Sequence, residues 1–160
     1  MMRCAVLTIS DSCHQGLRED ASGPAVRARL EAKGFRVTVT VVLPDEKALI
    51  AGRLLELCGS GEVDAVFTTG GTGVALRDVT PEATREVVER EIPGLAEKMR
   101  ADGMKITPLA ALSRGVAGVR GKVLLVNLPG SPKGAAESLD AILDLVPHII
   151  QLLNGNTGHS

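Results

Sequence analysis

A glycine-rich loop is the most distinctive candidate for chemistry in the 160-residue sequence. Gly70, Gly71 and Gly73 follow a short apolar run, with Thr69 before them and Thr72 among them. Glycines let backbone amides approach an anion without a Cβ in the way, and threonines add hydroxyl donors. The loop can therefore cradle a phosphate, although a tight turn alone explains the glycines equally well. It is not a P-loop, because no Gly-Lys-Ser/Thr follows it, and it lacks the spacing of a dinucleotide fingerprint.

Two aspartates could face the same cleft as this loop. Asp78 closes the glycine loop, and Asp45 begins the helix expected after the second strand. Mg²⁺ is usually held by one or two protein carboxylates, with water and substrate phosphate filling its other positions. The two carboxylates therefore indicate a magnesium site. The alternatives are a helix cap for Asp45 and a cap or turn for Asp78.

Other polar side chains stand where a ligand could be bound. Ser113-Arg114 places a hydroxyl beside a guanidinium, which suits an anion. Asn127 follows an apolar run, where a buried amide could either read a heterocycle or lock neighbouring loops. Lys133 could contact a phosphate. Surface positions for Arg114 and Lys133 and a structural role for Asn127 are the alternatives.

Composition excludes several classes of partner. Lysine and arginine total 18 against 19 aspartate and glutamate residues, so the net charge of −1 creates no field that would recruit nucleic acid or an anionic membrane. Phe35 and Phe67 are the only aromatic residues, which removes the stacking platforms that single-stranded nucleic acid binders use. No apolar stretch reaches the roughly 20 residues of a membrane helix. Three cysteines without CxxC spacing indicate neither a disulfide framework nor a zinc site. We therefore expect a cytoplasmic protein with no nucleic-acid or membrane partner.

The elements that must position these residues alternate between β-branched runs and helical patterns. Strands are expected at 3–10, 35–43, 65–69 and 122–128, helices at 22–33, 45–58, 80–92, 93–103 and 132–153, and mixed loop with a short strand at 106–121. The alternation predicts one α/β domain over 1–160, a three-layer sandwich in which helices flank a mostly parallel central sheet. Residues 154–160 are expected to fray.

Capping residues and apolar spacing define the expected helix boundaries. Ser22, Asp45 and Thr80 are expected N-caps, and Gly34 suits the left-handed position after a helix end. Pro147 could kink the last helix. The apolar residues that recur at helical spacing in the second helix, and are expected to be buried there, are Leu49, Ile50, Leu54, Leu57 and Cys58.

Ligands of open parallel sheets bind beyond the carboxyl ends of the strands. Four polar or glycine-rich loops fall at such ends, at 10–12, 44–46, 69–78 and 127–134. The topology therefore predicts that these loops share one cleft.

Taken together, seven motifs resemble those of the molybdopterin adenylyltransferases, a family that includes bacterial MogA-type proteins and the G domains of plant and animal relatives. The likeness follows the family's order from about Val6 to Leu153. The motifs are Thr8-Ile9-Ser10-Asp11, Asp20-Ala21-Ser22-Gly23-Pro24, Pro44-Asp45-Glu46, Thr69-Gly70-Gly71-Thr72-Gly73, Arg77-Asp78-Val79-Thr80-Pro81-Glu82-Ala83, Leu112-Ser113-Arg114 and Asn127-Leu128-Pro129-Gly130.

The resemblance implies an enzyme that transfers AMP from ATP to the terminal phosphate of molybdopterin, releases pyrophosphate and depends on Mg²⁺. It also implies a homotrimer, and a molybdenum insertase is a candidate partner. By the same resemblance, Asp45 and Asp78 would be the catalytic and metal-binding residues, and Thr69 to Gly73 would bind the nucleotide. The residues implied in pterin binding are Ser10, Asp11, Asp20, Ser113, Arg114, Asn127, Pro129, Gly130 and Lys133.

Two other functions are compatible with parts of this pattern. A competence-damage-type nucleotide pyrophosphatase has a glycine loop at this place, but its loop typically reads Gly-Gly-Leu-Gly-Pro-Thr. A noncatalytic pterin carrier or scaffold would not need both Asp45 and Asp78. Adenylyl transfer fits the lack of a recognisable catalytic histidine, because a pterin phosphate is already anionic at neutral pH and needs no general base.

Overall fold

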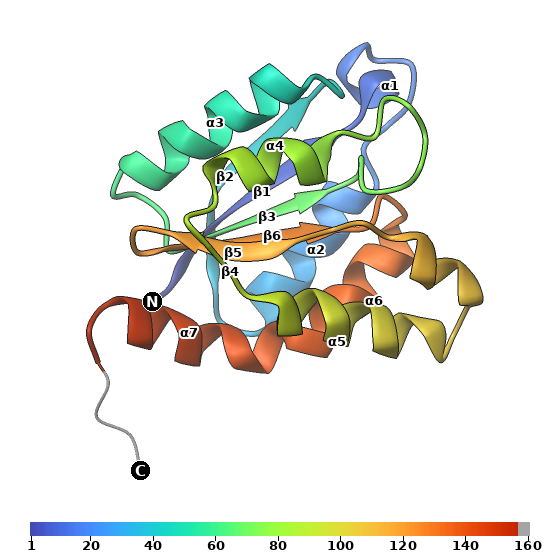
Figure 1. The fold of residues 1–160 in the computed structure, drawn as a ribbon. Helices are drawn as coiled ribbons and strands as arrows, with labels where there is room; N and C mark the ends of the chain where they lie inside the picture. The colour runs from blue at the N-terminus through green and yellow to red at the C-terminus, as the bar shows by residue number, and fades with distance from the viewer. Residues whose placement is uncertain (157–160) are drawn as a thin grey trace.

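Runs of branched aliphatic residues form a six-stranded sheet in the computed structural model, which describes residues 1–156 (Figure 1). Neighbouring strands run parallel from β2 to β6, whereas β5 is antiparallel to both β6 and β4. The prediction of a mostly parallel sheet is therefore confirmed. In spatial order the strands are β2 (Arg36–Leu43), β1 (Arg3–Ile9), β3 (Ala65–Thr69), β6 (Val123–Leu128), β5 (Ala117–Arg120) and β4 (Arg90–Glu91).

Helices cover both faces of this sheet, as the three-layer prediction requires (Figure 1). One face carries α2 (Ser22–Ala32), α5 (Pro93–Met104), α6 (Pro132–Ile142) and α7 (Val146–Leu153), and the other carries α3 (Lys47–Gly59) and α4 (Thr80–Val87). The short elements α1 (Asp11–His14), η1 (Pro108–Leu112) and η2 (Leu143–Leu145) lie in the connections.

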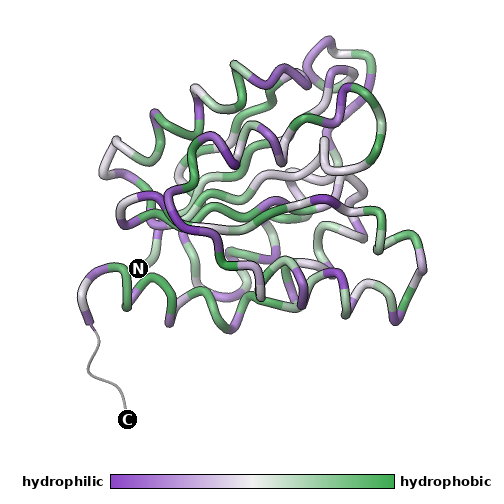
Figure 2. Tube along the Cα trace, in the orientation of Figure 1, coloured by the Kyte–Doolittle hydropathy of each residue, from purple (hydrophilic) through white to green (hydrophobic). Residues whose placement is uncertain are grey.

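Each face of the sheet has its own apolar core. Phe67 and Leu124 belong to the core under α2, α5, α6 and α7, whereas Leu7 and Leu125 belong to the core under α3 and α4. Successive side chains of a strand point to opposite faces, which explains the division. Figure 2 shows the strands mainly in green and the outward helix faces in purple.

Three predicted helix caps are wrong. Ser22 is the first residue of α2, and the backbone N–H of Gly23 donates instead to Asp20 Oδ1 at 3.0 Å. Asp45 precedes α3, whose cap position is Glu46, and its carboxylate bonds to another loop. Thr80 lies within α4, and its hydroxyl donates to the carbonyl of Gly70 at 3.0 Å. Local capping rules assign such side chains to helix ends, but here those of Asp45 and Thr80 form hydrogen bonds with other loops instead.

The other expected helix features are partly confirmed. Gly34 has a φ of +87° at the end of α2, as expected. In α3, Leu49 is 50% exposed, Cys58 is only partly buried, and Ala51 takes a buried place instead. The buried stripe of α3 is therefore Ile50, Ala51, Leu54 and Leu57, so the prediction is right for three of its five residues and wrong for Leu49 and Cys58.

The last predicted helix is divided into α6, η2 and α7. Pro147 lies in the first turn of α7, where its missing N–H leaves no carbonyl unpaired. The predicted kinked helix is therefore two separate helices, α6 and α7, with η2 between them. Asn154 to Asn156 still hydrogen-bond to the end of α7, and the rest of the tail expected to fray, 157–160, lies outside the described residues. Within residues 1–156, no helix is both long and apolar enough to cross a bilayer.

The carboxyl ends of four parallel strands meet at one edge of the sheet. Ile9 pairs with Leu43, Thr8 pairs with Thr69, and Thr69 pairs with Leu128. The loops after β1, β2, β3 and β6 therefore converge, and α1 lies beside the loop that follows β3 (Figure 1).

Candidate active site

The glycine loop, Gly70 to Gly73, has a backbone that only glycine adopts easily. Gly70 has a φ of +103° and Gly71 a φ of +69°. A Cβ on Gly70 would run into the carbonyl oxygen of Ile9, and one on Gly71 into the Thr80 hydroxyl. No hydrogen bond within residues 1–156 is donated by the backbone N–H of Gly71, Thr72 or Gly73. These amides are therefore free to donate to an anion, and the phosphate cradle stays a prediction.

The loop is tied to its neighbours by short hydrogen bonds. The Thr69 hydroxyl donates to the carbonyl of Pro129 at 2.6 Å, and Gly70 N donates to the carbonyl of Leu128 at 3.1 Å. Gly130 packs so closely that a Cβ there would lie 3.3 Å from the Cα of Gly70. Pro129 and Gly130 therefore fix the position of the glycine loop, Pro129 through its carbonyl and Gly130 through close packing.

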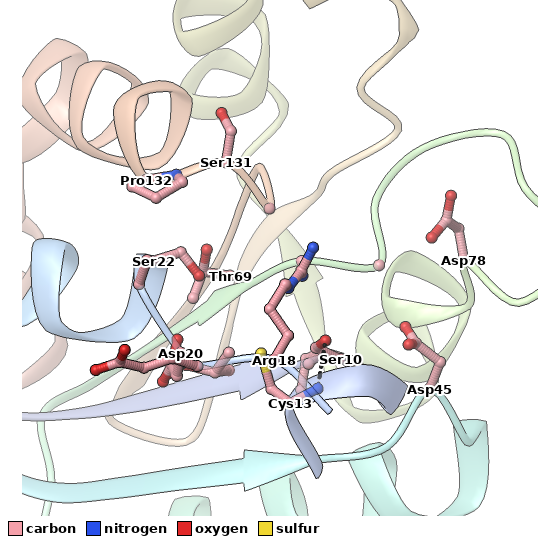
Figure 3. A pocket seen from close by; sticks show the side chains of 17 residues that line it. Ser10, Cys13, Arg18, Asp20, Ser22, Asp45, Thr69, Asp78, Ser131 and Pro132 are labelled. Carbon is pink, nitrogen blue, oxygen red and sulfur yellow. Dashed lines mark hydrogen bonds between the residues drawn. The ribbon is translucent and has the colours of Figure 1, made fainter. Parts of the chain in front are cut away.

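Asp45 and Asp78 both lie against the glycine loop. Asp45 Oδ1 is 3.0 Å from the place of a Cβ on Gly71, and Asp78 Oδ2 is 2.8 Å from the place of a Cβ on Gly73. Both residues line the same cleft, and their carboxylates lie on one side of it (Figure 3). Asp78 Oδ2 also accepts a hydrogen bond from Ala75 N at 3.0 Å, which holds the end of the loop.

A reciprocal pair of backbone hydrogen bonds fixes Asp45. Asp11 N donates to Asp45 Oδ2 and Asp45 N donates to Asp11 Oδ1, both at 2.9 Å. Arg77 then binds both carboxylate oxygens of Asp11, at 2.6 and 3.0 Å. The Arg77 guanidinium, more than any other group, lowers the pKa of Asp11 below its usual value. Asp11 thus joins the loops that follow β1, β2 and β3. Both of its carboxylate oxygens already accept hydrogen bonds from protein groups.

The electrostatic surroundings of Asp45 favour a bound cation. Burial raises the pKa of Asp45, and the negative charges of Asp11 and Asp78 raise it further, against the lowering effect of the Asp11 N–H. A carboxylate beside two others is costly to leave unneutralised. A divalent cation would relieve that repulsion.

A first cleft of about 540 Å³ opens beside this group. Ser10 and Asp20, two predicted site residues, line it together with Asp45, Asp78 and Gly70. The Ser10 hydroxyl accepts a hydrogen bond from Cys13 N at 3.2 Å and caps α1. Asp20 accepts from the Thr8 hydroxyl at 2.8 Å. Both side chains therefore also have a structural task.

A second cleft of about 480 Å³ lies across the loop from the first. Its lining includes Thr72, Gly73, Ser113 and Pro129 among the predicted site residues, together with the apolar side chains of η1. The residues common to both clefts form a shared rim, which consists of Gly71, Asp78, Gly130 and Ser131.

Arg114 lines neither cleft but braces the glycine loop from behind. Its guanidinium donates to the carbonyls of Gly73 and Asp78, each at 2.7 Å, and forms an ion pair with Glu82 at 2.7 Å. Its backbone N–H donates to the carbonyl of Thr72 at 2.8 Å. The pKa of Glu82 is lowered chiefly by its bond to this guanidinium. The side chain expected to contact substrate therefore holds the loop that carries Asp78.

Asn127 and Lys133 also lie outside both clefts. Asn127 is 2% exposed, and its amide group bonds to Thr68 and Thr84 at 3.0 Å and to Val116 N at 3.1 Å. The structural alternative for Asn127 therefore agrees with its contacts. The Lys133 side chain is 82% exposed, with Glu137 at 3.9 Å.

Several residues that line the first cleft were not predicted from the sequence. Cys13 and Arg18 reach it from the segment between β1 and α2, Ser22 reaches it from the first turn of α2, and Ser131 reaches it from the start of α6 (Figure 3). Ser131 could have been found, because a serine before proline is typical of a helix start, and its side chain caps α6. Arg18 gave no such signal, since an arginine in a loop usually faces solvent.

The chain is similar to known proteins over most of its length. The model of the family described as probable molybdopterin binding domain matches residues 5–148. The molybdopterin adenylyltransferase of Helicobacter pylori is 42% identical over 153 residues, which cover 94% of this chain and 87% of that protein. The crystal structure of the molybdopterin biosynthesis enzyme MoaB from Thermus thermophilus has a TM-score of 0.92 and 50% identity, and the match covers 97% of this chain and 98% of that one.

A more distant likeness bears on the alternative functions. The protein CinA from Thermoplasma acidophilum has a TM-score of 0.69, but its 17% identity shows a common fold alone. The matched family model spans most of this chain, and relatives of similar length share well over a third of its residues. The chain therefore belongs to the molybdopterin-binding domain family, whose members act in molybdenum cofactor biosynthesis.

Proposed function

We propose that the protein transfers an adenylyl group from ATP to the terminal phosphate of molybdopterin. The observation that carries the proposal is that Asp45 and Asp78 both lie against the glycine loop in the first cleft, and that Asp78 also belongs to the rim shared with the second cleft. The name of the relative in Helicobacter pylori, molybdopterin adenylyltransferase, supports the same reaction.

The two clefts suit two different ligands. The first cleft takes the ATP phosphates, because the free amide of Gly71 borders it and the N-terminal ends of α2 and α6 open onto it. The second cleft takes the pterin, because η1 supplies an apolar wall and Ser113 and Thr107 supply hydroxyl groups. The pterin phosphate and the α-phosphate of ATP then meet at the shared rim.

Mg²⁺ fits a donor set in which Asp78 lies on this rim and Asp45 lies beside the rim residue Gly71 in the first cleft. Within residues 1–156 no group of three or more histidine, cysteine or acidic side chains could hold a metal alone. Two carboxylates, Asp45 and Asp78, match an ion that takes its other ligands from water and substrate phosphate. When bound, Mg²⁺ would supply positive charge to the phosphates that react.

The chain's own groups then position the reactants and balance their charge. An oxygen of the pterin phosphate forms a new bond to the α-phosphorus, and the bond from that phosphorus to the bridging oxygen breaks. Pyrophosphate leaves with the electron pair of the broken bond. The amides of Gly71, Thr72 and Gly73 stabilise the charge on the phosphate oxygens, and no proton has to be removed from the attacking group.

Mass analysis of the product tests the proposal. Protein incubated with molybdopterin, ATP and Mg²⁺ should yield a pterin that is heavier by one AMP group, together with pyrophosphate. Pyrophosphate released equally well without molybdopterin would indicate a nucleotide pyrophosphatase instead. No turnover despite tight pterin binding would indicate a carrier or scaffold.

The resemblance to the family also gives a proposed assembly and location. The protein acts as a cytoplasmic homotrimer and passes its product to a molybdenum insertase. Exposed apolar side chains at the tip of the loop after β3, Leu76 at 99% exposure and Val74 at 71%, support burial in an assembly. A sedimentation mass of one chain would contradict the trimer.

A further inference from the structure

We propose that Arg18 binds the outer phosphates of ATP and stabilises the pyrophosphate as it leaves. This inference rests on the proposed function and adds to it a residue that neither the loop motifs nor the two aspartates include. The observation behind it is that Arg18 carries the one basic side chain among the residues that line the first cleft, and that this side chain has no partner within residues 1–156.

The charge of the first cleft needs such a residue. Its lining includes four acidic side chains and one basic side chain, which is Arg18. Two of the acids, Asp45 and Asp78, suit one divalent cation, and that leaves Glu19 and Asp20 facing a ligand with several negative charges. A triphosphate would be repelled unless a further positive group met it.

Arg18 is free to make this contact. Its guanidinium has no hydrogen bond or ion pair with any residue of 1–156, although Glu19 and Asp20 follow it in the chain. Its backbone N–H is fixed, because it donates to the carbonyl of Ser12 at 3.3 Å. The side chain therefore starts from an anchored point and extends into the cleft (Figure 3).

The position of Arg18 selects the outer phosphates. Arg18 lines the first cleft and not the second, which is the proposed pterin side. In phosphoryl and adenylyl transfer, the attacking and leaving oxygens lie roughly in line on opposite sides of phosphorus. With the pterin phosphate arriving from the second cleft, pyrophosphate must leave into the first, where the Arg18 fork can bind two of its oxygens.

Binding measurements without turnover test this assignment. Kd values for ATP, AMP and pyrophosphate would be measured by calorimetry with Mg²⁺ for wild type, Arg18→Ala, Arg18→Lys and Arg36→Ala. Arg36 is the matched control, since it is exposed at the start of β2 and has no side-chain partner within residues 1–156. Loss of a charge-assisted contact predicts ATP and pyrophosphate binding weaker by about tenfold or more in Arg18→Ala, with AMP changed by less than about twofold.

The other variants sharpen the result. Arg18→Lys should recover part of the affinity, because lysine keeps the charge but lacks the two-pronged geometry. Arg36→Ala should match wild type. Unchanged ATP binding in Arg18→Ala, or an equal loss for AMP and ATP, would overturn the assignment.

The experiment separates this inference from the proposed function. Wild type that binds ATP through Arg18 but never forms the adenylylated pterin would contradict the reaction and leave the Arg18 contact standing. Wild type that forms the product while Arg18→Ala binds ATP normally would contradict only the role of Arg18. A wild type that does not bind ATP would overturn both.

Discussion

The glycine loop and the segment between α1 and α2 border the same cleft but differ in the side chains that they present to it. Around the glycine loop, Arg114, Thr80 and Thr69 each donate side-chain hydrogen bonds to carbonyls of the loop or its neighbours. In the segment between α1 and α2, the Arg18 side chain has no partner within residues 1–156. One border of the cleft is therefore braced by side-chain hydrogen bonds, and the other carries a guanidinium that is unpaired within residues 1–156.

The difference separates two tasks in the proposed reaction. Groups that stabilise a transition state must already be oriented, since reorienting them during reaction costs free energy. A group that follows a departing phosphate gains from a long, adaptable side chain. We therefore expect substitutions in the braced loop to reduce turnover or stability most, and the following predictions test that division in order of decreasing effect.

Asp78→Asn should have the largest effect. The amide keeps the hydrogen bond to Ala75 N but loses the charge proposed to hold Mg²⁺ at the rim. We expect turnover to fall about 10²- to 10³-fold, while the Kd for molybdopterin changes little. Steady-state rates and fluorescence titration would measure the two quantities, with Asp144→Asn as control because Asp144 is 92% exposed and distant in the fold. Equal losses in turnover and pterin binding would refute the assignment of Asp78.

Arg114→Ala should have the next largest effect. It removes bonds to the carbonyls of Gly73 and Asp78 together with the ion pair to Glu82. We expect turnover to fall about tenfold to a hundredfold, because the loop would be misplaced, and stability to fall by about 1–3 kcal/mol.

Exchange measurements show whether Arg114 acts as a brace. Faster hydrogen exchange of the amides at 74–78 in Arg114→Ala, and a smaller change in Glu82→Gln, would agree with bracing. Weaker pterin binding with unchanged amide exchange would contradict bracing. It would instead support the pterin contact that the sequence predicted for Arg114.

Gly70→Ala should affect stability before it affects rate. A Cβ at a φ of +103° is strained and would meet the carbonyl of Ile9, which cannot move without breaking β1. Urea unfolding should show a loss of about 2–4 kcal/mol. Gly52→Ala is the control, since Gly52 lies in α3 with no atom near its Cβ position, and it should gain about 0.5–1 kcal/mol. Two variants of equal stability would show that the loop is not constrained.

Asp45→Asn should produce the smallest change in stability among these variants, and that change should stabilise the metal-free protein. The folded-state pKa of Asp45 lies above its ordinary value of 3.8, mainly because of burial. Between 3.8 and the raised value the folded state binds more protons than the unfolded state, so stability falls as pH rises through that window. Above this window the folded protein bears the full free-energy cost of the buried, ionised Asp45 carboxylate. The neutral amide in the variant has no such cost.

Thermal unfolding at several pH values measures this effect. Without Mg²⁺, Asp45→Asn should melt higher than wild type near neutral pH, and the difference should shrink as pH falls toward the ordinary value. A variant that melts at a lower temperature than wild type at neutral pH would contradict this prediction. It would show that the ionised Asp45 side chain stabilises the fold.

The fold and the glycine loop could be predicted from the sequence because both depend on local patterns. Strand runs, Gly34 after α2 and the unusual backbone of Gly70 and Gly71 each follow from residue type at one place. The parallel topology then determines that the loops at the carboxyl ends of the strands converge.

The partners of individual polar side chains could not be predicted in this way. Asp11, Arg114 and Asn127 carry groups that suit a ligand, yet each of them bonds to residues far away in the sequence. Arg18 and Lys133 are both basic residues whose surroundings in the sequence do not distinguish a ligand contact from a solvated surface position. Only the folded structure shows that Arg18 lines the first cleft and Lys133 does not. Which polar group is left unpaired depends on the whole fold.

The most direct test of the central claim is the position of the divalent cation in crystals grown with Mn²⁺ and a nonhydrolysable ATP analogue. The account predicts one anomalous peak within about 2.5 Å of an oxygen from both Asp45 and Asp78, with the analogue's phosphates on the first-cleft side. A peak bound by phosphates alone, with the two carboxylates directed elsewhere, would contradict it.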